Sequence, residues 1–529
     1  MNHMNRRWKI LILAVAVLGA AILIPVIRHY QLRAVTEAYI AQLKAKGEPM
    51  ELAQVIPPPV PPEQNAAPLI TNALSQIHLE SNYTNAIYFK NPPGAMNRII
   101  PGKEMVGWHQ PVIHTSNTTW PPNLTNTWDD LGAQLSERLN NLNDFRKLIK
   151  NPKFDFNYDY SDPKMYIPVL APHLSQIKMA FQWLDASEYY NLHQDKTADA
   201  CTDIRTMLAF IKGQTDERFE ISQLIRFAIA SISASATWDI LQTTNVSDED
   251  LAQLQQDWQS LEFIAPLKKA FLFERLSELQ LLKDLRQSPT NLDGQVAWTQ
   301  FTSNMNNEHS NSDERSFFQK AKDGIASQWD KFQWRWFWSY TDEVRGLQMW
   351  GVVIGGTQML ETNKSFPSVQ SFVNTNFVRL DFDSVKDNPY AIISQNAGSQ
   401  LAAIRKAANA EVARNVVITA IALKRYELRH HQFPAALNEL TPDLLNAVPI
   451  DCMDGQPLRY RPNADGTFLL YSVGGNGRDD GGDPSLEKGV TGSNFNWQNP
   501  KALDWVWPQP ATAEEVQKYY EEQGKKSGS

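Results

Sequence analysis

The chain has 529 residues, of which 42% are hydrophobic and 20% charged, as in folded domains, which excludes a largely disordered protein. Its formal net charge of -8 argues against nucleic acid as a partner, because phosphate binding requires clustered lysine and arginine. The two cysteines, Cys201 and Cys452, have no C-x-x-C spacing, which excludes zinc ribbons and thioredoxin-like redox sites. We therefore expect two unpaired thiols.

An uncharged run from Ile10 to Ile27 predicts a transmembrane anchor. It contains 18 residues, the lower limit for crossing a bilayer core of about 30 Å. A cleaved signal peptide is the alternative, but the run stays apolar beyond the candidate cleavage point at Gly19-Ala20-Ala21. Three basic residues precede the run (Arg6, Arg7, Lys9), which favours a cytoplasmic tail of residues 1–9. We expect a single-pass protein of a bacterial inner membrane, with the bulk of the chain in the periplasm.

Residues 28–62 are predicted to form a stalk and a proline-rich spacer. Helical periodicity continues after the anchor from Tyr30 to Lys46. The segment from Val55 to Pro62 contains five prolines, which remove backbone donors and favour a stiff polyproline II structure. The pattern therefore predicts that the body stands away from the membrane.

Residues 63–390 are predicted to form a large body of antiparallel helices. A short helix is expected at 63–80, followed by an irregular excursion at 82–126 that is rich in Asn, Pro, Thr and Trp. Amphipathic helices joined by short connections come next, which is typical of antiparallel neighbours. We place them at residues 130–149, 165–194, 197–213, 217–243, 247–260 and 262–287. A polar loop is expected at 288–315 and a last long helix at 388–431.

The segment from Phe317 to Trp350 is dense in aromatic residues. The rings at positions 334, 336, 337 and 338 cannot share one face of a helix. We interpret the segment as a central helix that is buried on most sides. The alternative is that some rings are exposed at a contact surface, where tryptophan can stack on a sugar.

Catalytic signatures are absent from the sequence, which contains no G-x-S-x-G, H-E-x-x-H or G-x-x-x-x-G-K-[ST] motif. One acidic group remains as a candidate site. Asp155 and Asp159 would share a face of an extended segment at 154–160, and Asp162 follows it. Such carboxylates suit acid–base chemistry or cation binding, or they form the solvent side of an edge strand.

The C-terminal region carries an ordered series of short motifs. A helix ends in the element Tyr426 to Pro434, and a turn spans Pro449 to Pro457. Two strands are predicted at 458–461 and 467–472, joined by a turn. A loop rich in glycine and aspartate, Tyr471 to Asp483, completes the series. In this order the motifs resemble the globular domain of the major pseudopilin of type II secretion systems.

The resemblance implies a small α+β domain with a calcium site. In that family the acidic glycine loop binds calcium, a hard cation that takes several oxygen ligands. By position, the ligands in this chain would be Asn476, Asp479, Asp480 and Asp483. Asn476 stands where the family often has aspartate, which removes one negative charge. The alternative is an Asp/Gly turn cluster that binds no metal.

The anchor departs from the pseudopilin pattern, because it lacks the processing site and the glutamate that opens the family's hydrophobic helix. The predicted fold is therefore mainly α: a transmembrane helix, a helical body, an α+β pseudopilin-like domain at 391–510 and a polar tail at 511–529. The predicted function is a non-catalytic, membrane-anchored envelope scaffold with protein partners in a secretion or pilus-like assembly. The alternative is an envelope hydrolase or glycan-binding protein, with its site near Asp155 to Asp162 or in the aromatic segment.

Overall fold

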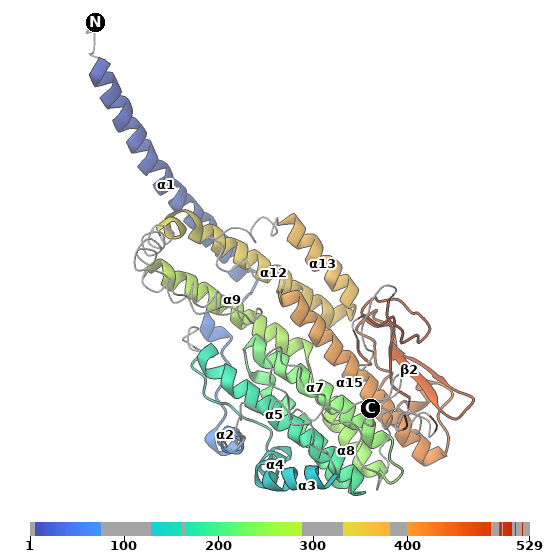
Figure 1. The fold of residues 1–529 in the computed structure, drawn as a ribbon. Coiled ribbons are helices and arrows are strands. Elements are labelled where there is room, and N and C mark those ends of the chain that lie inside the picture. Colours follow the sequence, from blue (N-terminus) through green and yellow to red (C-terminus); the bar gives the residue numbers. More distant parts are fainter. Residues whose placement is uncertain are drawn as a thin grey trace.

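The computed structural model describes residues 6–75, 128–160, 166–287, 332–380, 399–487, 497–499, 501–509, 514 and 521. Over these residues the protein is mainly α-helical, as predicted, with a small antiparallel sheet near the C-terminus. The expectations for residues 82–126, for 288–315 and for most of the tail after 511 lie outside the described residues. Figure 1 shows the long helices side by side along the body, with the sheet at the end opposite the free half of the first helix.

The helices, in chain order, are α1 (Arg6–Ala45), α2 (Ala67–Ser75), α3 (Trp128–Glu137), α4 (Leu139–Arg146), α5 (Tyr166–His193), α6 (Thr197–Gly213), α7 (Glu220–Leu241), α8 (Asp248–Gln259), α9 (Ile264–Gln287), α12 (Ser339–Asn363), α13 (Phe366–Arg379) and α15 (Ser399–His430). A π-helical segment, η6 (Trp334–Trp338), precedes α12. The strands are β1 (Arg459–Pro462), β2 (Phe468–Ser472) and β3 (Trp505–Val506). Most helices from α5 to α9 lie within three residues of their predicted bounds, because their apolar periodicity and short polar joints are strong signals.

Helix α1 runs without a break from the apolar segment into the body. Its N-terminal half projects away from the other helices, whereas its C-terminal half lies against η6 and α12 (Figure 1). Leu43 is buried there with Leu279 of α9 and Leu347 of α12. Just beyond the helix, Glu48 forms an ion pair with the buried Arg275 of α9. The segment predicted to be a free stalk is therefore part of the body, because its apolar face is covered by two other helices.

The body is a layered array in which consecutive helices pack on one another. Helix α5 packs on α6 and α7, α7 and α8 pack on α15, and α9 packs on α12. One hydrophobic cluster runs through these helices and into the sheet, where it includes Leu470 and Trp505. The predicted boundary at residue 390 therefore does not separate two cores. Helix α15 belongs to both parts, because one side of it packs on α7 and α8 and another on β2.

Helix α8 illustrates how the chain fixes these contacts. Its N-cap, Ser247, accepts a hydrogen bond from the backbone N–H of Asp250 at 3.0 Å. Acidic residues occupy the first turn, where their negative charges interact favourably with the positive end of the helix dipole. One of them, Asp248, accepts hydrogen bonds from Arg425 and Arg429 of α15 at 2.8 and 2.7 Å. The same charges that start α8 thus also bind it to α15.

The expectation of a strand at 154–160 is wrong. The segment has no strand partner, and Asn157 adopts a left-handed conformation (φ 56°) that breaks the alternation of side chains. The rings of Phe154 and Tyr160 are buried, and they contact Phe210 of α6 and Phe219 respectively. Aromatic packing against helices, rather than a ladder of backbone hydrogen bonds, holds this segment.

The end of α6 offers a sharp test of this packing. A Cβ atom on Gly213 would lie 1.9 Å from the carbonyl oxygen of Pro152 and 2.5 Å from the ring of Phe154. We expect Gly213→Ala to lower the free energy of unfolding by about 1–3 kcal/mol, because the backbone must move to relieve the overlap. Gly351→Ala on α12, where nothing lies within 4 Å, is the matched control and should be neutral or stabilising. Urea unfolding followed by circular dichroism measures both, and equal midpoints would contradict the expectation.

The aromatic segment is only partly buried. Trp334 is buried, but Phe332 is 46% exposed, and Trp336, Phe337 and Trp338 are half-buried. The interpretation as a central buried helix is therefore wrong for most of these rings. The π-helical turn η6 contributes to this outcome, since its wider repeat spreads consecutive rings over more than one face.

The C-terminal strands form a sheet in the order β1-β2-β3, with both pairs antiparallel. The pairing of Arg459 with Tyr471 and of Pro462 with Phe468 confirms the predicted hairpin. Strand β3 was not predicted, because two residues are too few to show an alternating pattern. Beyond it, the carbonyl of Pro508 accepts a hydrogen bond from the indole of Trp238 on α7, which ties the sheet to the helical core.

Candidate functional site

Two features of the described residues are candidates for function: the apolar half of α1 and a polar network in the C-terminal hairpin. In α1, nine of the large apolar side chains between Ile10 and Ile27 are 51% to 65% exposed. They include four consecutive residues, Ile10 to Leu13, which point in all directions around a helix. Around Ile10 to Leu13 the helix is therefore exposed on every side. By length and composition, one helix among the described residues passes a membrane-span test, the core helix α7, and 61% of its most apolar window is buried.

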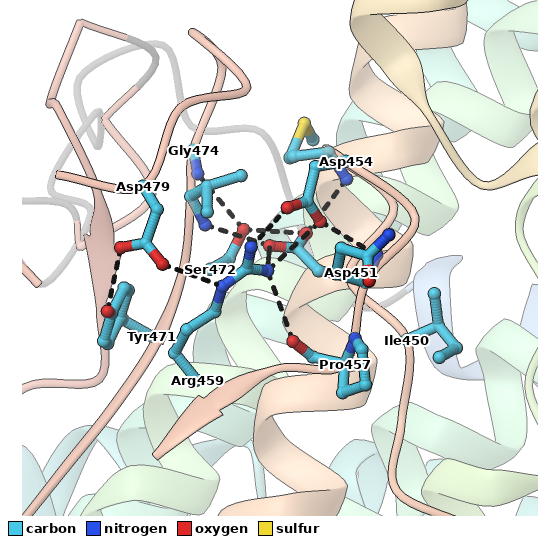
Figure 2. Close-up of polar contacts among 12 residues, drawn as sticks. Ile450, Asp451, Asp454, Pro457, Arg459, Tyr471, Ser472, Gly474 and Asp479 are labelled. Atoms are coloured by element: carbon cyan, nitrogen blue, oxygen red, sulfur yellow. Dashed lines mark hydrogen bonds and ion pairs between the residues drawn. The ribbon is translucent and has the colours of Figure 1, made fainter. Parts of the chain in front are cut away.

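The polar network is centred on Arg459 at the start of β1 (Figure 2). Its guanidinium donates to Asp454 with two nitrogens in a forked arrangement, and its Nε donates to Asp479 at 3.3 Å. A third carboxylate, Asp451, lies 3.6 Å from the same group. The side chain of Arg459 is only 18% exposed. One half-buried cation therefore joins the turn before β1 to the loop after β2.

Asp451 is the most deeply buried member of the network. Its carboxylate accepts hydrogen bonds from Ser472 Oγ and from the backbone N–H groups of Met453 and Val473, each at 2.9 Å. Burial raises the pKa of Asp451, and these three donors oppose that shift. Through these hydrogen bonds Asp451 holds the turn 451–455 against the end of β2.

The four predicted calcium ligands lie in one loop but do not converge on one point. Asp479 accepts hydrogen bonds from Tyr471 at 2.9 Å, from Arg459 and from the backbone of Gly481. Although burial opposes it, these donors lower the pKa of Asp479. The amide nitrogen of Asn476 donates to Asp480 at 2.9 Å, and Asp483 caps the backbone of Ser485 at 2.9 Å.

Asp504 is a residue of the loop network that sequence reasoning missed. It is fully buried, and its carboxylate accepts from the backbone N–H groups of Gly482 at 2.7 Å, Asp483 at 3.2 Å and Asp480 at 3.4 Å. Burial raises the pKa of Asp504 against these hydrogen bonds. No local pattern points to this role, because Asp504 lies more than 20 residues from its partners.

The side chains of this loop form internal hydrogen bonds in this structure, instead of the open set of oxygens that calcium takes. Among the described residues, which include the whole loop 474–487, no group of three His, Cys, Asp or Glu side chains is placed to hold a metal. The oxygens of Asp479 already accept from a guanidinium and a phenol, and Asn476 directs an N–H at Asp480. Calcium requires six to eight oxygen ligands at roughly 2.3–2.6 Å, without competing donors.

We therefore expect calcium to leave the stability of the protein unchanged. The measurement is the melting temperature of the full chain in detergent, in millimolar calcium and in excess chelator. Because a ligand that binds only the folded state must raise the melting temperature, equal values exclude a site that is saturated under these conditions. A rise of several degrees with calcium, lost in Asp480→Asn, would instead restore the four-ligand prediction.

The acidic group in the body does not form a catalytic pair. Asp159 is exposed, and Asp155 is half-buried and uses its carboxylate to accept from the backbone of Asn157 at 2.8 Å. Asp162 lies outside the described residues. A separate small cavity between α9 and α12 contains Glu278, whose pKa burial raises and whose carboxylate accepts from the indole of Trp350. This cavity has room for about one water molecule, which is too little for a substrate.

A scan against protein-family models and searches of curated proteins and of solved structures found no match to this chain. What the chain does must therefore be inferred from its residues and their geometry.

Proposed function

We propose that this protein is a membrane-anchored scaffold of the bacterial envelope, which holds its C-terminal hairpin module at a fixed place relative to the inner membrane. Its partner would be an envelope protein of a secretion or pilus-like assembly. One observation carries the proposal: α1 is a single 40-residue helix, half of it exposed and apolar on all sides and half of it packed into the body. An anchor built in this way cannot swivel independently of the body.

A membrane position for α1 is supported by the free energy that it would cost to leave the apolar half of the helix in water. Exposed apolar side chains on every face would leave a large hydrophobic surface in water, at roughly 25 cal/mol for each Å². A bilayer removes that surface from water, and the helix satisfies its own backbone hydrogen bonds there. The basic residues before the run favour the N-terminus inside and the body in the periplasm.

The contacts along the body support a rigid connection between the anchor and the C-terminal module. Helix α1 packs on α12, α12 packs on α9 and α15, and α15 contacts β2. Arg414 of α15 donates to the carbonyls of Trp258 and Gln259 at the end of α8, at 3.0 and 2.9 Å. Each joint is made by buried apolar contacts or charged hydrogen bonds, so the module and the anchor form parts of one body.

Site-specific photocrosslinking in native membranes tests the scaffold. A photoreactive residue replaces Ile450, an exposed apolar residue of the module whose side chain points away from Arg459 (Figure 2). The matched control position is Gln256, exposed on α8. We expect Ile450 to yield a discrete adduct with an envelope protein that resembles a secretion or pilus subunit, and Gln256 to yield none. Identical adducts from both positions, or none from Ile450, would count against the proposal.

The competing function is an envelope hydrolase or glycan-binding protein. The half-buried rings of η6 and the exposed Phe332 are the observation that favours it, because such rings can stack on sugars. The test is release of soluble fragments from purified peptidoglycan, and retention of the protein on it, with Trp336→Ala as the comparison. Retention that is lost in this variant would support glycan binding over the scaffold.

A further inference from the structure

We propose that the aromatic residues around η6 lie in the headgroup layer of the bilayer, so that the body rests directly on the membrane. The aromatic collar is defined as Phe332, Trp336, Phe337, Trp338 and Tyr340. Its partner is a lipid surface. The inference rests on the proposed membrane position of α1 and adds to it the site at which the body meets the bilayer.

The collar touches α1 where the apolar run ends. His29, two residues after Ile27, has its ring centroid 4.9 Å from that of Trp336 and 5.1 Å from that of Tyr340. Its Nδ1 lies 3.1 Å from the carbonyl oxygen of Trp336, which accepts the hydrogen bond. About two turns further along α1, Thr36 donates to the carbonyl of Tyr340 at 3.3 Å. These contacts join residues some 300 positions apart and place the collar at the point where α1 leaves the body.

The length of the anchor brings that point to the membrane surface. At about 1.5 Å per residue, the run from Ile10 to Ile27 spans roughly 27 Å, slightly less than the hydrocarbon core. The apolar run is therefore too short to extend beyond the bilayer and separate the body from it. His29 lies about 3 Å beyond the last apolar residue. Because α1 is one continuous helix from the apolar run into the body, this length places the collar within about one helical turn of the core boundary.

The chemistry of the collar matches the headgroup layer. Tryptophan and tyrosine combine an apolar ring with a polar group, and both gather at membrane interfaces. Phe332 is 46% exposed and Trp336 is half-buried, so part of their surface is open to a neighbour. Arg28, exposed on α1, and Arg335, in η6, supply positive charge at the same level, where lipid phosphates lie. Continuity with the apolar run favours lipid over a protein as the occupant.

Depth-dependent fluorescence quenching tests this placement on the full chain in lipid nanodiscs. A bimane label is attached through Phe332→Cys at the collar, Leu13→Cys in the anchor or Gln256→Cys on α8, which lies away from the free half of α1 (Figure 1). The native thiols should not react: both are buried, and burial raises the pKa of Cys201 to about 12. The unsubstituted chain serves as the labelling control.

We expect the label at 332 to be quenched more strongly by lipids that carry the quencher near the headgroup than by those that carry it near the bilayer centre. The label at 13 should show the reverse order, and the label at 256 should not be quenched. If the label at 13 is quenched but the label at 332 is not, the body lies away from the bilayer. This inference is then wrong, while the membrane position of α1 is retained. If 13 is not quenched either, the anchor itself is wrong and the proposed function fails with it.

Discussion

Arg459→Ala is expected to destabilise the C-terminal module by about 3 kcal/mol, because it leaves Asp451 and Asp454 without their shared cation. Asp451 is fully buried and keeps its three hydrogen-bond donors, yet its negative charge would have no partner. The loss should appear as a lower urea midpoint and as faster proteolysis after β2, since Arg459 also holds Asp479 in that loop. The hydrogen bonds raise the pKa of Arg459, so it remains charged throughout the usual pH range.

Two further variants test whether the loss of stability comes from the contacts of Arg459 itself. Arg461→Ala removes the same charge two residues further along β1, where the side chain is exposed, and should change stability by no more than about 0.5 kcal/mol. Arg459→Lys keeps the charge but loses the forked contact with Asp454, so we expect an intermediate midpoint. Equal midpoints for Arg459→Ala and Arg461→Ala would show that the network does not stabilise the module.

The protein should be more stable at pH 5 than at pH 8, because buried carboxyl groups in the helical body bind protons in the folded state. Burial raises the pKa of Glu217 and of Asp185 to about 7. Burial, together with the neighbouring Asp239 and Asp185, also raises the pKa of Glu188, whose Oε1 has no hydrogen-bond partner among the described residues. Asp185 keeps part of its surface open to solvent, so Glu217 and Glu188 are the stronger cases.

The direction follows from proton linkage. A carboxyl group whose pKa is higher in the folded state contributes stability that is fully present below its unfolded value, near pH 4.5, and is lost as the pH rises through about 7. For Glu217 the upper limit is about 3 kcal/mol. Glu217→Gln removes the ionisation and should narrow the difference between the urea midpoints at pH 5 and pH 8. Glu63→Gln, an exposed surface control, should leave that difference unchanged. A chain equally stable at both pH values would refute the expectation.

The bounds of helices α5 to α9 and the C-terminal hairpin are the parts that the sequence predicted well. Helix α6 matches its predicted range of 197–213, and the hairpin partners lie within a few residues of a visible turn at 463–466. These elements depend on signals between neighbouring residues, namely apolar periodicity, caps and turn residues. The helix predicted at 130–149 is interrupted at Arg138, where the chain turns from α3 to α4. No glycine or proline marks that break, so the sequence offered no signal for it.

The geometry of the candidate sites, by contrast, could not be predicted from local sequence signals. The loop from Asn476 to Asp483 was found from its composition. Whether its oxygens face a metal or internal donors depends on Arg459 of β1 and on Asp504, just before β3. Likewise, the apolar run of α1 is evident in the sequence, whereas the collar beside it forms because His29 meets Trp336 across 307 positions. Contacts at such separations depend on how whole helices pack, and local patterns do not encode that packing.

The sequence by itself determined a mainly helical chain with an apolar N-terminal segment, two unpaired cysteines and a C-terminal hairpin, because composition and short-range periodicity suffice for these. Only the tertiary structure decided that one side of residues 30–45 packs against the body, that one core crosses the predicted boundary at 390, and that a half-buried guanidinium cross-links the acidic loop. The physical reason is the same in each case. Burial and charge pairing are properties of surfaces brought together by folding, and each surface is assembled from residues far apart in the chain.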